Sequence, residues 1–103
     1  MNNEILEKIN KLEQQILVWA CCYYRFDYNI VSDAMYDNKG WELMELIKQY
    51  PNEFKKSSYY EEFYEYDKGN TPSAFNINFM LPNIQSRAWH LIQLLKEENN
   101  NEN

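Results

Sequence analysis

The sequence of 103 residues contains very little glycine, and this shortage excludes several classes of nucleotide-handling enzyme. Its two glycines are Gly40 and Gly69, and neither follows an aspartate. A P-loop and a G-x-G-x-x-G dinucleotide turn both need more glycines, because their backbones must approach phosphate groups closely. The sequence therefore excludes most enzymes that hold phosphates in a glycine-rich loop.

Basic residues and metal-binding residues are also scarce. Lys and Arg number 10 against 16 Asp and Glu, which gives a formal net charge of −6. Since affinity for nucleic acid comes largely from Lys and Arg that displace counterions from phosphates, we expect no direct binding of nucleic acid. The single histidine, His90, has no cysteine or histidine three or four residues away, so we expect no metal site.

Long apolar runs are absent as well. No stretch approaches the roughly 20 apolar residues of a membrane span, and residues 1–10 lack the pattern of a signal peptide. The two cysteines, Cys21 and Cys22, are adjacent, and neighbouring cysteines form a disulfide only with strain. These features predict a reduced cytoplasmic protein without membrane contact.

The abundant residues are aromatic and helix-forming ones, with 3 Trp, 9 Tyr and 5 Phe in the chain. Apolar residues recur every three or four positions, which is typical of amphipathic helices. We predict an all-α, single-domain fold over residues 1–97, with an antiparallel helix pair, a short acidic helix and a C-terminal helix. The predicted helices cover 3–26, 33–49, 58–66 and 83–97. Pro51 should end the second helix, and Ser58 should open the third one through a capping box. The first two helices should pack through Ile9, Leu12, Ile16 and Trp19 against Leu43, Met44 and Ile47, and the apolar stripe of the last helix is Ile84, Ala88, Leu91 and Leu95. We expect the polar, asparagine-rich tail 98–103 to be disordered.

The densest group of polar and aromatic residues lies between the first two predicted helices. The sequence reads YYRFDYNIVSDAMYD from Tyr23 to Asp37 and continues without a gap to WELMELIKQYP, which ends at Pro51. In order and spacing, residues 12–51 resemble the small N-terminal helical domain (Ia) of NAD-dependent DNA ligases. In that family the domain contacts the nicotinamide mononucleotide (NMN) half of NAD.

The resemblance implies a nicotinamide-nucleotide site formed by Tyr23, Tyr24, Asp33, Tyr36 and Asp37. The chemistry is consistent, because an oxidised nicotinamide ring is a cation that aromatic faces attract. Carboxylates can accept hydrogen bonds from ribose hydroxyls or from the carboxamide. NMN or NAD is therefore an expected ligand, although no cofactor is required. The same residues could instead serve the fold alone, with Asp33 as an N-cap and the tyrosines in the core.

The chain also departs from the ligase pattern. The ligases carry a nucleotidyltransferase domain whose lysine lies in a K-x-D-G motif, and this chain has no Asp-Gly dipeptide. The resemblance therefore implies a protein without adenylation or ligation activity, so we predict that the chain is not an enzyme. A stand-alone module of this type and the Asn-, Lys- and Glu-rich composition suit a phage or prophage source.

A second group of residues, 59–67, is acidic and rich in tyrosine, and we call it the acidic segment. Tyrosine supplies large contact area at low entropic cost, and carboxylates complement a basic partner surface. We favour a small interaction protein that inhibits or modulates a host defence (anti-CRISPR-like or anti-restriction-like) or DNA-processing protein. A stand-alone NMN or NAD binder is the alternative, and a solvated acidic face is the simplest interpretation. The predicted partner contacts are Tyr60, Glu61, Glu62, Tyr64, Glu65 and Asp67.

Overall fold

The computed structural model describes residues 3–64 and 79–101, which form five helices with no strand among them. The all-α prediction is therefore confirmed. No helix in these two ranges is long and apolar enough to cross a membrane. The helices are α1 (Asn3–Tyr24), α2 (Asp33–Gln49), α3 (Pro51–Lys55), α4 (Tyr60–Phe63) and α5 (Pro82–Asn101).

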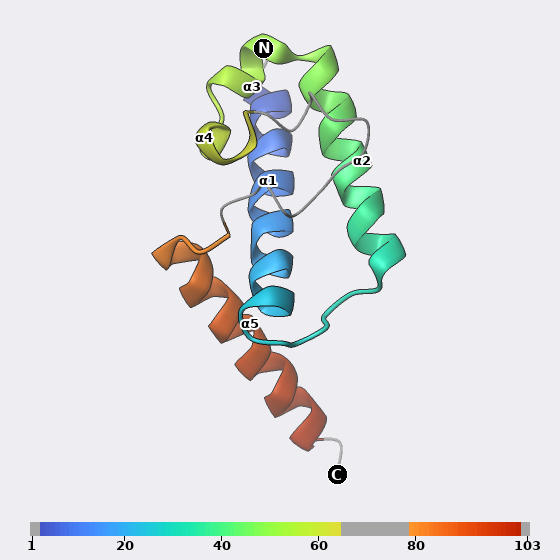
Figure 1. The fold of residues 1–103 in the computed structure, drawn as a ribbon, viewed down its shortest axis with the longest axis vertical. Coiled ribbons are helices and arrows are strands. Elements are labelled where there is room, and N and C mark those ends of the chain that lie inside the picture. Colours follow the sequence, from blue (N-terminus) through green and yellow to red (C-terminus); the bar gives the residue numbers. More distant parts are fainter. Residues whose placement is uncertain (1–2, 65–78, 102–103) are drawn as a thin grey trace.

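Helix α1 is the centre of the fold (Figure 1). Helix α2 runs antiparallel to it on one side, and α5 packs across its C-terminal half on the other. The predicted packing of α1 against α2 is confirmed, since the apolar residues of both helices join one buried cluster while Trp19 stays half-buried. These buried residues are Ile9, Leu12 and Ile16 of α1 and Leu43, Met44 and Ile47 of α2.

Helix α5 completes the core on the far side of α1. The Cys22 thiol lies 3.8 Å from the carbonyl oxygen of Ala88, so the two helices meet closely there. Ile84, Ala88 and Ile92 are buried, whereas Leu91 of the predicted stripe is half-buried. The helix continues to Asn101, four residues beyond the end that the sequence predicted.

The connector between α1 and α2 reverses the chain within eight residues. The amide of Tyr28 donates to the Cys22 carbonyl at 2.9 Å, and Asp27 adopts a left-handed backbone with φ 54°. Aspartate tolerates this conformation better than most residues other than glycine. The Ser32 hydroxyl then accepts a hydrogen bond from the Met35 amide at 3.2 Å and caps α2.

The segment after α2 differs from the prediction. The helix predicted over 58–66 begins at Tyr60, and no side chain caps it, so the expected capping box at Ser58 does not form. Contacts with α1 replace the local cap, because the Ser58 amide donates to Asn10 Oδ1 at 2.8 Å. Pro51, which was expected only to end α2, also starts the extra helix α3 at its first position.

Candidate functional site

A pocket opens where the end of α1, the connector and the start of α2 meet, and we call it the α1–α2 pocket. Four of the five residues that the ligase resemblance selected line it, and Asp37 does not. The pocket therefore brings together the end of α1 and the start of α2, which in the sequence only the family pattern had linked. Its described lining residues are Trp19, Ala20, Tyr23, Tyr24, Asn29, Ile30, Val31, Asp33 and Tyr36.

The last turn of α1 supplies two accessible aromatic rings to this pocket. The rings of Tyr23 and Tyr24 meet edge to face, with their centroids 4.8 Å apart. Phe79, which precedes α5, stacks on Tyr24 with the ring centroids 5.5 Å apart, and it is not one of the lining residues. Because Tyr23 and Tyr24 remain 47% and 48% exposed, a bound ligand can still reach their rings.

Tyr36 presents a different chemistry, since its hydroxyl is buried and has no hydrogen-bond partner among the described residues. Burial raises the pKa of Tyr36 above its usual value, and the nearby Tyr24 hydroxyl and Asp37 carboxyl act in the same direction. The hydroxyl therefore stays protonated at neutral pH and is available as a donor. A buried donor without a partner costs about 1–3 kcal/mol, which a ligand oxygen could recover.

The two carboxylates of the predicted site occupy different positions. Asp33 is the first residue of α2 and lines the pocket, whereas Asp37 lies one turn further along and is also exposed. The alternative role of Asp33 as N-cap is wrong, because Ser32 caps the helix. Across the described ranges, no three His, Cys, Asp or Glu residues gather in a group that could hold a metal ion.

The sequence did not identify five of the nine described residues that line the pocket. Trp19 belongs to the apolar pattern of α1, and residues 29–31 belong to the connector between α1 and α2. Nothing in the composition of Asn29, Ile30 and Val31 marks them as pocket residues. The available signal was their position, since a short connector between two helix ends that line one pocket must pass close to that pocket.

The acidic segment is only partly assembled as a surface. Tyr60 is half-buried, with its ring 4.9 Å from that of Phe54, and Glu62 is half-buried as well. Glu61 is exposed, and Tyr64 is 47% exposed with its ring 6.3 Å from that of Tyr60. The predicted contacts Glu65 and Asp67 lie outside the described residues.

A buried carboxyl group near the acidic segment was also missed. Glu13 of α1 is fully buried, and it accepts hydrogen bonds from the Ser57 hydroxyl at 2.8 Å and the Tyr59 amide at 3.2 Å. Burial raises its pKa from 4.5 to about 7, although the two hydrogen bonds oppose the rise. Its position four residues after buried Ile9 was a signal that it faces inward.

Comparison with known proteins points to the same part of the chain and supports the resemblance. Residues 2–60 match the family model described as "DNA ligase-like, N-terminal NAD+-binding domain". The DNA ligases of Lactobacillus gasseri and Lactobacillus johnsonii are each 39% identical to this chain over 51 residues. That alignment covers 50% of this chain and 8% of each ligase. No solved structure gives a significant match.

Proposed function

The chain belongs to the family of DNA ligase-like N-terminal NAD+-binding domains, and from this premise we propose that it binds NMN or the nicotinamide end of NAD. The observation that supports the proposal is the α1–α2 pocket. Tyr23, Tyr24, Asp33 and Tyr36, which the family pattern selects, all line it. The proposed site is the pocket, with the ligand lying against the exposed rings of α1.

Each lining group has a role in this proposal. The rings of Tyr23 and Tyr24 attract the cationic nicotinamide ring, an interaction worth about 0.5–2 kcal/mol. The Tyr36 hydroxyl donates to a carboxamide or ribose oxygen, and Asp33 accepts a hydrogen bond from a ribose hydroxyl. Asp37 stays a predicted contact, but since it does not line the pocket we expect Asp33→Ala to weaken binding more than Asp37→Ala.

We propose further that the role is binding without catalysis. The sequence has no Asp-Gly dipeptide and hence no K-x-D-G lysine motif for adenylation. The described residues of the pocket supply rings, a hydroxyl donor and a carboxylate, and among them no nucleophile is paired with a base.

Titration calorimetry of the full chain with NMN, NAD and ADP-ribose tests the proposal. NMN and NAD should bind, and ADP-ribose, which lacks the nicotinamide ring, should bind far more weakly. Tyr23→Ala should weaken NMN binding, whereas Tyr64→Ala is a matched control because both tyrosines are 47% exposed. Equal, negligible heats for all three ligands would mean that the pocket is only part of the scaffold.

The acidic segment supports a second hypothesis, a partner protein with a Lys- and Arg-rich surface. The observation in its favour is that Glu61 and Tyr64 are both exposed near α4. Reversing Glu61, Glu62 and Glu65 to Lys should slow association with such a partner at low salt. The phage-type source and the inhibition of a host protein stay predictions from the sequence.

A further inference from the structure

The charged groups around the α1–α2 pocket bear on which nicotinamide compound it prefers. Asp33 is the charged residue among the described ones that line the pocket, and none of those residues is Lys, Arg or His. Given the proposed function, on which this step rests, we propose that the pocket selects for the cationic ring and against a phosphate. Nicotinamide riboside, which has the ring and the ribose but no phosphate, is then bound more tightly than NMN.

The cation that directly follows α1 in the sequence is directed away from the pocket. Arg25 follows Tyr24 in the sequence, but it does not line the pocket. Its guanidinium carbon lies 5.2 Å from the centre of the Phe26 ring, and that ring packs against Trp89 of α5 at 5.6 Å. The guanidinium thus lies over the Phe26 ring.

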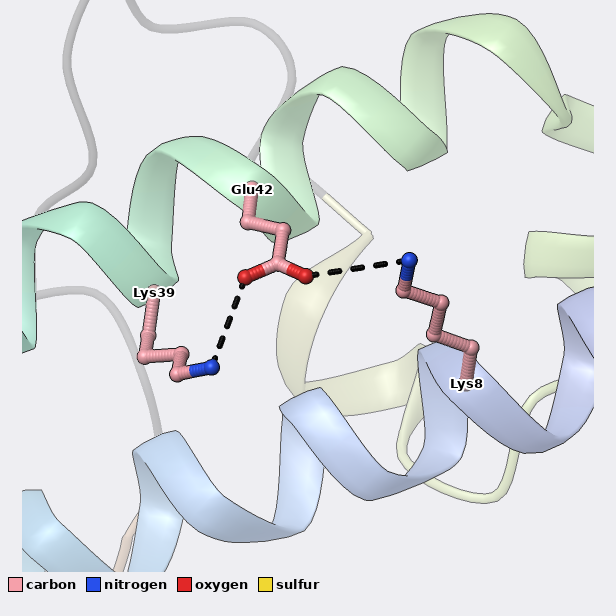
Figure 2. Close-up of polar contacts among 3 residues, drawn as sticks. All are labelled: Lys8, Lys39 and Glu42. Carbon is pink, nitrogen blue, oxygen red and sulfur yellow. Dashed lines mark ion pairs between the residues drawn. The ribbon is translucent and has the colours of Figure 1, made fainter.

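Lys39, the lysine of α2 nearest in sequence to the pocket residues, is paired with a glutamate. Figure 2 shows the Lys39 and Lys8 side chains directed toward Glu42 from opposite sides. The Lys39 Nζ atom lies 3.5 Å from one Glu42 oxygen, and the Lys8 Nζ atom lies 3.8 Å from the other. Exposed ion pairs of this kind add little stability, but they place both ammonium groups beside Glu42.

The positive end of the α2 helix dipole does not substitute for a cation. Free amides at a helix N-terminus often bind phosphate. Here the Ser32 hydroxyl accepts from the Met35 amide at 3.2 Å, and the Asp33 carboxylate lies in the first turn. The Ser32 hydroxyl thus takes the place of an anion at the Met35 amide. The Asp33 carboxylate compensates the helix dipole and repels an incoming anion.

The expected preference follows from the ligand charges. Nicotinamide riboside carries the single positive charge of its ring, whereas the phosphate of NMN adds a charge of about −1.5 to −2 at neutral pH. For an assumed separation of about 8 Å in a water-like dielectric, repulsion between Asp33 and a phosphate dianion lowers the affinity about five-fold. Added salt should reduce this ratio, because exposed charges are screened.

Calorimetric or NMR titration of the full chain with nicotinamide riboside and NMN tests the selection. We expect the riboside to bind about five-fold more tightly at low salt. The ratio should fall toward one in Asp33→Asn. Asp27→Asn is a matched control, because Asp27 is exposed, does not line the pocket and has a left-handed backbone that asparagine tolerates. It should keep the wild-type ratio.

The possible failures are distinguishable. If wild-type protein binds NMN as tightly as the riboside or more tightly, the charge selection is wrong and the nicotinamide site remains. If Asp33→Asn keeps the wild-type ratio, Asp33 is not the source of the selection, and the proposal in this form is wrong. If neither compound binds, the proposed function itself is overturned, and the selection with it.

Discussion

Replacing Glu13 with glutamine should remove most of the dependence of folding stability on pH between about 4.5 and 7. In the folded protein Glu13 of α1 is fully buried and bonded to Ser57 and Tyr59, and burial raises its pKa from 4.5 to about 7. In this pH range the unfolded chain has lost the Glu13 proton while the folded chain still holds it. Because the folded state binds more protons there, stability falls as the pH rises.

The size of the effect follows from the pKa difference. One pKa unit corresponds to about 1.36 kcal/mol, so a rise from 4.5 to about 7 gives an order-of-magnitude loss of about 3 kcal/mol between the two pH limits. Glutamine resembles the protonated acid. Its carbonyl oxygen can accept from the Tyr59 amide, and its amide can donate to the Ser57 hydroxyl. The variant should match wild type near pH 4.5 and exceed its stability at pH 8.

Urea unfolding followed by circular dichroism at pH 4.5, 6 and 8 measures this effect. Glu7→Gln provides a matched control, since Glu7 lies on the same helix and is exposed, and it should keep the wild-type pH dependence. A wild-type protein as stable at pH 8 as at pH 5 would refute the reasoning. A Glu13→Gln variant with an unchanged pH slope would refute it as well, because the slope would then come from other groups.

Three further outcomes concern the core and its polar contacts. Ile16→Ala should cost about 2–5 kcal/mol in urea unfolding, since Ile16 is fully buried, and a loss below about 0.5 kcal/mol would contradict the packing. Burial raises the pKa values of both cysteine thiols, that of Cys22 to about 11. Native protein should therefore react with a thiol reagent at pH 8 far more slowly than urea-unfolded protein. Equal rates would mean that Cys21 and Cys22 are accessible. Tyr59→Phe removes the hydroxyl that accepts a hydrogen bond from Asn83 Nδ2 at 2.9 Å. The change should lower the free energy of unfolding by about 1 kcal/mol, measured by thermal unfolding. An unchanged melting temperature would show that this bond adds nothing to stability.

The long helices were predictable because their signals are local. The apolar spacing from Ile9 to Ile16 and the capping residue Ser32 specify α1 and the start of α2 without reference to the rest of the chain. The family pattern located the pocket for a related reason. Its residues lie at two helix ends that one short connector holds together.

The missed features depend on contacts between distant segments. Ser58 has the local pattern of a capping residue, but its backbone bonds to Asn10, 48 positions earlier, and the cap does not form. The buried side of α5 includes Ile92 instead of Leu91, because the crossing angle with α1 decides which side faces inward. Glu13 is buried because Ser57 and Tyr59 supply its hydrogen bonds, and no local rule pairs these positions.

Helix α5 lies outside the residues that match the ligase family, yet it covers the side of α1 around Cys22. A fragment that ends at residue 60 would therefore contain the family motif without part of its own core. It would leave α1 with an uncovered apolar strip, and exposed strips of this kind favour self-association and aggregation. Attempts to transplant the pocket into another protein should keep α5, or supply another amphipathic helix to shield that strip.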